Sequence, residues 1–399
     1  MKFLSAPPTL VLPVLAAVSL VNAAAEGLTY TPNNDVTAHS KITLDQLDIK
    51  DLIDAGNFTS ALDIYQNGKN REGKSLQAMA RKDWVEAGLE DVSDYDAYAA
   101  LFNQGDGEPF LDSFNLDAMN CNGSFAGQTA DMCAISAKKN LLCTGLLYAQ
   151  YEGINAIQYS NEKNWDELFA FWNGVYDETV DSRVNSGGPG AVQASRDGDF
   201  GTSFREASIQ AVIDGQAAFS GDSVDTAKLT QAYEAFNRAN LATFVQATLK
   251  YSALFDEKDL DQALIDKKWG EGYTYFRCGA GLMDPELALY INYVLDPRDK
   301  MDMTLTPKET HCKIVNKMLS LEEIGMGLKM DDLNLEYYLP LATIKADCGL
   351  DSLQHAEGKS SNGSKSERAY LPFIGMLVVL GLYVAAYFVT RKNPDPKNV

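Results

Sequence analysis

Residues 165–172 read WDELFAFW, and residues 269–276 repeat the pattern as WGEGYTYF. The repeat pairs like residues with one another: Trp165 with Trp269, Glu167 with Glu271, Phe169 with Tyr273, and Phe171 with Tyr275. Each stretch also follows a similar segment, since Asn140, Leu141 and Tyr151 recur 100 residues later as Asn240, Leu241 and Tyr251. A long helix followed by a Trp-x-Glu-aromatic helix thus occurs twice, which predicts a duplicated helical unit with two lobes. Chance similarity between amphipathic helices is the alternative.

The remaining pattern of the chain is also helical. Apolar residues recur at three- and four-residue spacing in five segments, 130–151, 165–179, 204–217, 229–255 and 260–277. Two more helices are predicted at 285–295 and 307–319, because each begins with a proline at a plausible first helical position. Alternating strand patterns are scarce and short. We therefore expect a mainly α fold.

Composition divides the chain into segments. The stretch SGGPG at 186–190 begins the clearest internal break, which continues to about residue 202. We expect a first helical lobe at 24–185, a linker at 186–202 and a second helical lobe at 203–355. Residues 356–370 contain the run EGKSSNGSKS, which predicts a flexible stalk.

The two ends of the chain predict where it resides. Residues 1–23 carry a lysine, an apolar run and small residues at their end, which is typical of a cleavable signal peptide. Residues 371–390 read LPFIGMLVVLGLYVAAYFVT, an uncharged run long enough for about 30 Å of hydrocarbon. Arg391 and Lys392 follow and begin a tail at 391–399. We expect a single C-terminal transmembrane helix, a type I protein of the plasma membrane and an extracellular ectodomain. A buried core helix and a lipid-anchor signal are the less favoured alternatives.

The charge of the chain limits its partners. It carries 34 Lys and Arg against 55 Asp and Glu, a formal net charge of −21. Such a surface repels nucleic acid and anionic headgroups and attracts cations, so we expect no nucleic-acid partner. A charge that only keeps a secreted body soluble is the simpler reading.

Six cysteines, an even number, predict three disulfides in an oxidising compartment: Cys121, Cys133, Cys143, Cys278, Cys312 and Cys348. Fifteen pairings exist for six cysteines. The local pairs Cys121–Cys133 and Cys312–Cys348 are the first guesses, and they would leave Cys143 with Cys278. Three glycosylation acceptors agree with secretion: Asn57, Asn122 and Asn362.

Sequence motifs that would indicate nucleotide binding, calcium binding or catalysis are weak in this chain. Residues 68–75 match the phosphate-loop pattern GxxxxGK[ST], yet the segment before them predicts a helix where a strand is needed. Asp197 and Asp199 resemble part of a calcium loop, but no glutamate closes its twelve-residue frame. No nucleophile-elbow or HExxH signature occurs, and the chain has only three histidines. We therefore expect a protein that is not an enzyme.

The helix predicted around residues 269–277 offers metal ligands. Glu271 and Tyr275 lie four residues apart, as do Tyr273 and Arg277, so each pair shares a helix face. Carboxylate and phenolate oxygens are hard ligands that suit Fe(III), and an arginine can hold a bridging anion. The alternative is that both tyrosines are packed aromatic residues with solvated hydroxyls.

Several blocks resemble a known family. They are residues 61–70 (ALDIYQNGKN), 74–77 (KSLQ), 195–202 (SRDGDFGT), 240–251 (NLATFVQATLKY) and 271–277 (EGYTYFR). Together they resemble the algal iron-assimilation proteins, which include the phytotransferrins of diatoms. The resemblance covers roughly residues 42 to 300.

The resemblance implies a cell-surface protein that binds ferric iron for high-affinity uptake, with carbonate as a synergistic anion and internalisation of the loaded protein into endocytic vesicles. Candidate residues rest on chemistry and block position: Tyr65, Glu271, Tyr273 and Tyr275 for the metal, and Arg277 for the anion. The short tail shows no internalisation signal, so uptake would need an endocytic or reductase partner. The alternatives are a metal-free surface ectodomain for binding or adhesion and, least favoured, a secretory hydrolase.

Overall fold

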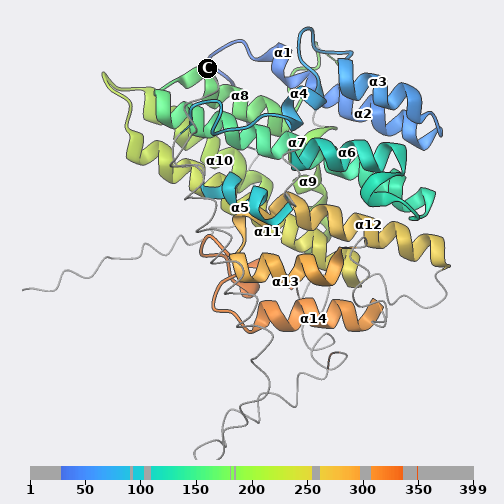
Figure 1. Cartoon of the computed structure of the whole chain (residues 1–399). Coiled ribbons are helices and arrows are strands. Elements are labelled where there is room, and N and C mark those ends of the chain that lie inside the picture. The colour runs from blue at the N-terminus through green and yellow to red at the C-terminus, as the bar shows by residue number, and fades with distance from the viewer. Residues whose placement is uncertain are drawn as a thin grey trace, which may run out of the picture. The chain divides into compact units, whose positions relative to one another are not determined.

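The computed structural model describes residues 28–89, 93–102, 109–179, 181–183, 186–253, 261–296, 307–335 and 348 (Figure 1). The α-helices are α1 (Thr37–Ser40), α2 (Ile42–Asp54), α3 (Phe58–Asn67), α4 (Leu76–Ala80), α5 (Ser93–Phe102), α6 (Phe110–Asn120), α7 (Ala130–Tyr159), α8 (Glu162–Asn173), α9 (Gly188–Phe200), α10 (Phe204–Gln216), α11 (Thr226–Ala253), α12 (Gln262–Gly279), α13 (Pro285–Leu295) and α14 (Pro307–Leu319). Short 3₁₀ turns occur at Gly123–Phe125, Ala217–Phe219, Ala280–Leu282 and Met330–Leu333. Within these described ranges the pairing of extended backbone is limited to one bridge between Gly325 and Leu328. The prediction of a mainly α fold is confirmed.

The predicted helices are present, and local signals explain their ends. Helices α13 and α14 have the predicted bounds. Pro285 occupies the first turn of α13, and the Asp284 carboxylate accepts a hydrogen bond from the Leu287 backbone N–H at 2.9 Å. Helix α10 ends one residue before its predicted end, whereas α8 ends six residues before its predicted end because Gly174, at φ 77°, follows its last turn.

Two long helices form the centre of the molecule. Helix α7 has 30 residues and is buried on nearly all sides over most of its length, as is the 28-residue α11. Such helices belong inside a core rather than on a surface. Helix α7 packs against α6, α8 and α12, and α11 packs against α10, α12 and α14. Figure 1 shows α13 and α14 side by side beneath α12.

The glycine-rich stretch is not the linker that we predicted at 186–202. It forms α9, in which Gly188, Pro189 and Gly190 are buried against α8. A Cβ atom on Gly188 would lie 2.8 Å from the Trp172 carbonyl oxygen, and Gly188 also has φ 80°. Glycine is therefore required here for a close approach of two helices, rather than for flexibility.

The predicted halves share one body. Residues up to Cys348 form a single compact unit, in which α7 of the first half packs against α12 of the second. The order of a long helix and a Trp-x-Glu-aromatic helix does occur twice, as α7–α8 and α11–α12. The expectation of two lobes separated by a linker is thus corrected to a single helical body with two similar helix pairs.

Three disulfides connect this body: Cys121–Cys133, Cys143–Cys278 and Cys312–Cys348. The pairing that we favoured on local spacing is confirmed. Cys143 lies on α7 and Cys278 on α12, and both are fully buried, so this bond joins the two halves through the core.

Several predictions fall on residues that the structure does not describe. They are the signal peptide (1–23), the stalk (356–370), the transmembrane helix (371–390), the tail (391–399) and Asn362. Among the described helices, none combines the length and the apolar character needed to cross a bilayer. Asn57 and Asn122 are exposed, as glycosylation acceptors must be, and their glycosylation stays a prediction.

Candidate functional site

Tyr65, the first predicted ligand, belongs to a buried polar network. Its hydroxyl donates to Asp112 at 2.8 Å and accepts from the Asn115 amide at 3.1 Å. Arg81 contacts the other oxygen of Asp112 at 2.9 Å. These partners satisfy the phenol and fix α3 against α6. These contacts give Tyr65 a structural role between α3 and α6.

Tyr273 and Arg277 are also placed in packing roles. The Tyr273 hydroxyl donates to Asp296 at 2.8 Å and to Asn292 at 3.2 Å, which ties α12 to α13. The Arg277 guanidinium lies 4.0 Å from the ring centroids of both Phe102 and Phe114. A cation between two aromatic faces is stabilised by both rings.

Glu271 and Tyr275 lie elsewhere on α12, and helices α9 and α11 bring further polar groups to them. We call this set the second-half cluster; it consists of Lys139, Arg196, Asp199, Lys250, Tyr251, Lys268, Glu271 and Tyr275. The rings of Tyr251 and Tyr275 stack, with centroids 5.3 Å apart and planes 22° apart. Lys139 lies 5.2 Å from the centroid of the Tyr275 ring. Lys268 and Arg196 lie 5.2 and 5.8 Å from the centroid of the Tyr251 ring.

The charges of the second-half cluster are unbalanced. The Asp199 carboxylate forms ion pairs with Lys250 and Arg196, each at 2.9 Å. The Glu271 carboxylate forms ion pairs with Lys268 at 3.4 Å and with Lys139 at 3.7 Å. Four cations thus surround two carboxylates. A cluster with this excess of positive charge attracts a small anion.

Arg196 has unused hydrogen-bond donors. Its side chain is only 7% exposed, and its Nε and Nη1 atoms are buried without a partner. The donors of a buried guanidinium are normally hydrogen-bonded, because a buried charged donor without a partner costs free energy. Two N–H donors of this arginine are therefore available to an oxyanion.

Burial holds the two tyrosines of the cluster in the neutral form. Burial is the largest cause that raises the pKa of Tyr251 to about 12, and the neighbouring Tyr275 and Glu271 raise it further. Burial also raises the pKa of Tyr275 well above its ordinary value, and the Arg196 charge partly opposes this shift. Both phenols are neutral at pH 7, so a metal that binds them must displace their protons.

No three His, Cys, Asp or Glu side chains within the described ranges converge as a metal-binding group. The second-half cluster offers two carboxylates and two phenols. A metal here would therefore take some oxygen ligands from tyrosine and others from a bound anion or water.

Two motifs singled out in the sequence have structural roles. The phosphate-loop pattern at 68–75 joins helices α3 and α4, and the Asp45 carboxylate accepts from the backbone N–H groups of Lys69 and Asn70 at 3.3 and 2.8 Å. A carboxylate occupies the place where a phosphate-binding loop would hold its anion. The loop is thus held by a contact within the protein, between α2 and the residues that follow α3.

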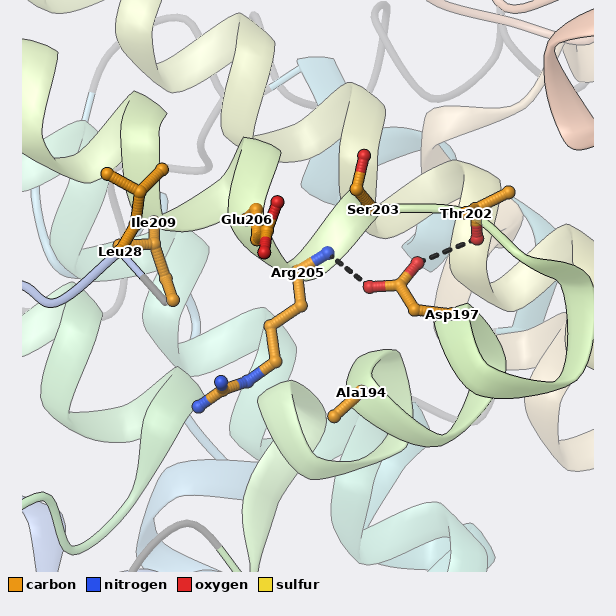
Figure 2. Close-up of a pocket in the computed structure, with 8 residues that line it drawn as sticks. All are labelled: Leu28, Ala194, Asp197, Thr202, Ser203, Arg205, Glu206 and Ile209. Atoms are coloured by element: carbon orange, nitrogen blue, oxygen red, sulfur yellow. Dashed lines mark hydrogen bonds between the residues drawn. The ribbon is translucent and has the colours of Figure 1, made fainter. Parts of the chain in front are cut away.

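Asp197 caps the start of α10. Its carboxylate accepts from the Thr202 hydroxyl at 2.7 Å and from the backbone N–H groups of Phe204 and Arg205 at 2.8 and 2.7 Å. Figure 2 shows this carboxylate at the edge of a surface pocket lined by Leu28, Ala194, Asp197, Thr202, Ser203, Arg205, Glu206 and Ile209. Its oxygens are thus committed to the helix terminus, and the calcium-loop resemblance has a structural explanation.

The chain matches a family model over residues 9–257, more than half of its length, and that model describes low iron-inducible periplasmic proteins, the Fea1 family. The chain belongs to the Fea1 family. This confirms the resemblance to algal iron-assimilation proteins. Searches of curated proteins and of solved structures gave no match.

The residues matched to the Fea1 family include part of the second-half cluster. Arg196, Asp199, Lys250 and Tyr251 lie inside the matched range, and Glu271 and Tyr275 lie beyond its end at residue 257. In this Fea1-family chain, three of the blocks that carried the resemblance meet at the second-half cluster: 195–202 at the end of α9, 240–251 on α11 and 271–277 on α12.

Only Glu271 and Tyr275 of the second-half cluster were predicted as site residues from the sequence, and its other six residues were missed. Arg196 and Asp199 lie in the block SRDGDFGT, whose Asp197 and Asp199 suggested only a calcium-loop fragment. Tyr251 was noted only as the partner of Tyr151 in the repeat. The sequence repeat could have identified Tyr251. It aligns Tyr251 with Tyr151 and Glu271 with Glu167, so each half has this tyrosine and this glutamate on consecutive helices.

Proposed function

We propose that this Fea1-family protein binds ferric iron together with carbonate at the second-half cluster, as the capture step of iron assimilation. The observation that carries the proposal is the meeting of two phenols, two carboxylates and an arginine with two unpaired donors, from α9, α11 and α12. Hard oxygen donors of these types suit Fe(III). Membership of a low iron-inducible family supports iron as the cargo.

The charge of the cluster explains why an anion must accompany the metal. Four cations against two carboxylates repel a bare trivalent ion. Carbonate would first accept a hydrogen bond from an unpaired donor of Arg196 and lower the local positive charge. The iron would then replace the phenolic protons of Tyr251 and Tyr275 and take oxygens from Glu271 and Asp199. The lysines released from these carboxylates would remain beside the anion.

The predicted membrane anchor and signal peptide complete the proposal. A signal peptide at 1–23 and an anchor at 371–390 would hold the iron-binding body outside the cell, at the plasma membrane. A tethered carrier keeps its iron at the surface, where a soluble one would lose it by diffusion. Because the tail at 391–399 is so short, transfer into the cell would require an endocytic or reductase partner.

The test is a ferric titration of the purified full-length protein, with and without bicarbonate, against a competing chelator. We expect saturable binding that needs bicarbonate and gives the visible absorption of a ferric phenolate. Tyr251→Phe and Tyr275→Phe should weaken binding. Tyr273→Phe is the matched control on the same helix, because its hydroxyl is committed to Asp296 and Asn292. If no saturable ferric binding occurs in either buffer, the proposal is refuted and a metal-free binding or adhesion ectodomain is favoured.

A further inference from the structure

The first half of the molecule contains a second buried cluster of carboxylates, cations and a phenol. We call it the first-half cluster; it consists of Arg71, Lys74, Tyr148, Glu152 and Glu167. Arg71 and Lys74 come from the loop between α3 and α4, Tyr148 and Glu152 lie on successive turns of α7, and Glu167 lies on α8. Tyr148, Glu152 and Glu167 are all buried.

The repeat relates this cluster to the second-half cluster. Glu167 is the counterpart of Glu271, and Phe171 is the counterpart of Tyr275. In each half a cation lies against that aromatic ring: Arg71 lies 5.4 Å from the centroid of Phe171, and Lys139 lies 5.2 Å from that of Tyr275. Phe171 has no hydroxyl, but Tyr148 brings a phenol next to it. The ring centroids of Tyr148 and Phe171 lie 4.8 Å apart in an edge-on contact.

The cations of the first-half cluster are not neutralised by its carboxylates. Lys74 donates to the Tyr148 hydroxyl at 2.6 Å, and Nη1 of Arg71 is buried without a partner. Glu152 accepts from the amides of Asn164 and Asn155 at 2.6 and 3.2 Å. In the described part of the chain no ion pair joins Arg71 or Lys74 to Glu152 or Glu167, so opposite charges share one buried space without contact.

Burial disfavours the charged form of the carboxylates and cations in this cluster. Burial, and then the charge of Glu167, raises the pKa of Glu152 to about 6. Burial also raises the pKa of Glu167 and lowers the pKa of Lys74 and of Arg71, and Lys74 is further lowered by repulsion from Arg71. Charged groups kept at such a cost in a buried cluster are a recognised sign of a ligand site.

His39 orients one carboxylate of the cluster. Its Nε2 atom lies 3.1 Å from Glu167 Oε1, and its ring packs edge-on against Phe171 at 5.7 Å. Lys163 reaches the same Glu167 oxygen at 3.6 Å. Two groups thus fix one oxygen of Glu167 and leave its second oxygen available to a ligand, so we regard His39 as a positioning residue.

We propose that the first-half cluster is a second site for ferric iron and an oxyanion, so that one chain carries two ferric ions. Tyr148, Glu152 and Glu167 supply the oxygen ligands, and Arg71 and Lys74 hold the anion. The proposal rests on the proposed function of the second-half cluster, because it takes the same cargo. One phenol in place of two makes this the weaker of the two sites.

The experiment is an iron stoichiometry on the purified full-length protein, titrated with ferric iron and bicarbonate. One double variant, Glu152→Gln with Glu167→Gln, removes both carboxylates of the first-half cluster. A second, Tyr251→Phe with Tyr275→Phe, removes both phenols of the second-half cluster. Glu234→Gln, an exposed position on α11, is the control for loss of acidic charge.

We expect two equivalents of iron in the wild type and in the control, and one equivalent in each double variant. A wild type that binds one equivalent, unchanged by the first-half variant, overturns this inference and leaves the proposed function standing. Two equivalents that survive the second-half variant refute the proposed function instead.

Arg71→Met keeps the inference testable if the double glutamate variant does not fold, because methionine preserves the aliphatic packing over Phe171. It should remove the bicarbonate dependence of the weaker equivalent and leave the stronger one intact. A weaker equivalent whose bicarbonate dependence is the same in Arg71→Met as in the wild type overturns the inference.

Discussion

Replacing Tyr275 by phenylalanine should change how ferric affinity depends on pH. Tyr275 is 2% exposed and stacks on Tyr251 at 5.3 Å, so phenylalanine preserves the packing and removes only the hydroxyl. Its raised pKa keeps the phenol neutral throughout pH 6–8. Each ferric ion that binds the phenolate must therefore release one proton from this residue, and the variant releases one proton fewer.

The magnitude follows from proton linkage. One proton released on binding raises the affinity about tenfold for each pH unit. The ratio of wild-type to variant affinity should thus grow roughly 100-fold between pH 6 and pH 8. At neutral pH the variant should also bind at least about 100-fold more weakly, because even the partners of metal ligands contribute roughly 10- to 100-fold.

The assay is a competition titration against a chelator of known affinity, at fixed bicarbonate, at three pH values. Wild type and variant are compared at the same pH, so hydrolysis of free iron and protonation of the chelator cancel in the ratio. Tyr273→Phe is run in parallel and should show a constant ratio to the wild type. A Tyr275→Phe ratio that does not change with pH would refute the assignment of this phenol as a ligand.

Three further predictions concern stability. Replacing Cys143 and Cys278 together by alanine opens a cross-link between residues 135 apart and should cost about 4–5 kcal/mol in urea unfolding, and an unchanged midpoint would contradict this. Gly215→Ala should cost about 3 kcal/mol by thermal melting, because its Cβ would lie 2.1 Å from the Trp165 ring; a cost below about 1 kcal/mol would show that α8 and α10 separate easily. Glu152→Gln should stabilise the protein by about 2 kcal/mol at pH 7.5, since a folded pKa of about 6 against an ordinary 4.5 means that stability falls as pH rises through this window. The gain should vanish at pH 4, and a gain that is equal at both pH values would point to a cause other than ionisation.

Local sequence signals predicted the helices well. Pro285 after Asp284 fixed the start of α13, because proline suits the first turn and aspartate caps it. The glycines at 187, 188 and 190 led to the wrong prediction of a linker. Glycine is common in loops and linkers, but it also permits close contacts between helices. The difference lies in the approach of Gly188 to the Trp172 carbonyl, which is a tertiary contact and leaves no trace in the local pattern.

The candidate site was predicted in part for a similar reason. Spacing on one helix correctly placed Glu271 and Tyr275 on a common face. The same spacing joined Tyr273 with Arg277, yet their partners come from α13, α5 and α6, which local periodicity does not reveal. Arg196 entered the site only through the packing of α9 against α11.

The bond between Cys143 and Cys278 imposes an order on biosynthesis. Chain elongation proceeds at about 5–20 residues per second, so Cys143 must remain a thiol for on the order of 10 s before its partner is made. Cys133 becomes available to Cys121 much earlier, after 12 residues. Mispairing of Cys143 with these nearer thiols is the chief hazard during this interval. Because α12 carries both Cys278 and Tyr275, formation of this bond and docking of Tyr275 into the second-half cluster coincide, and a chain that cannot form the bond would lack the proposed iron site.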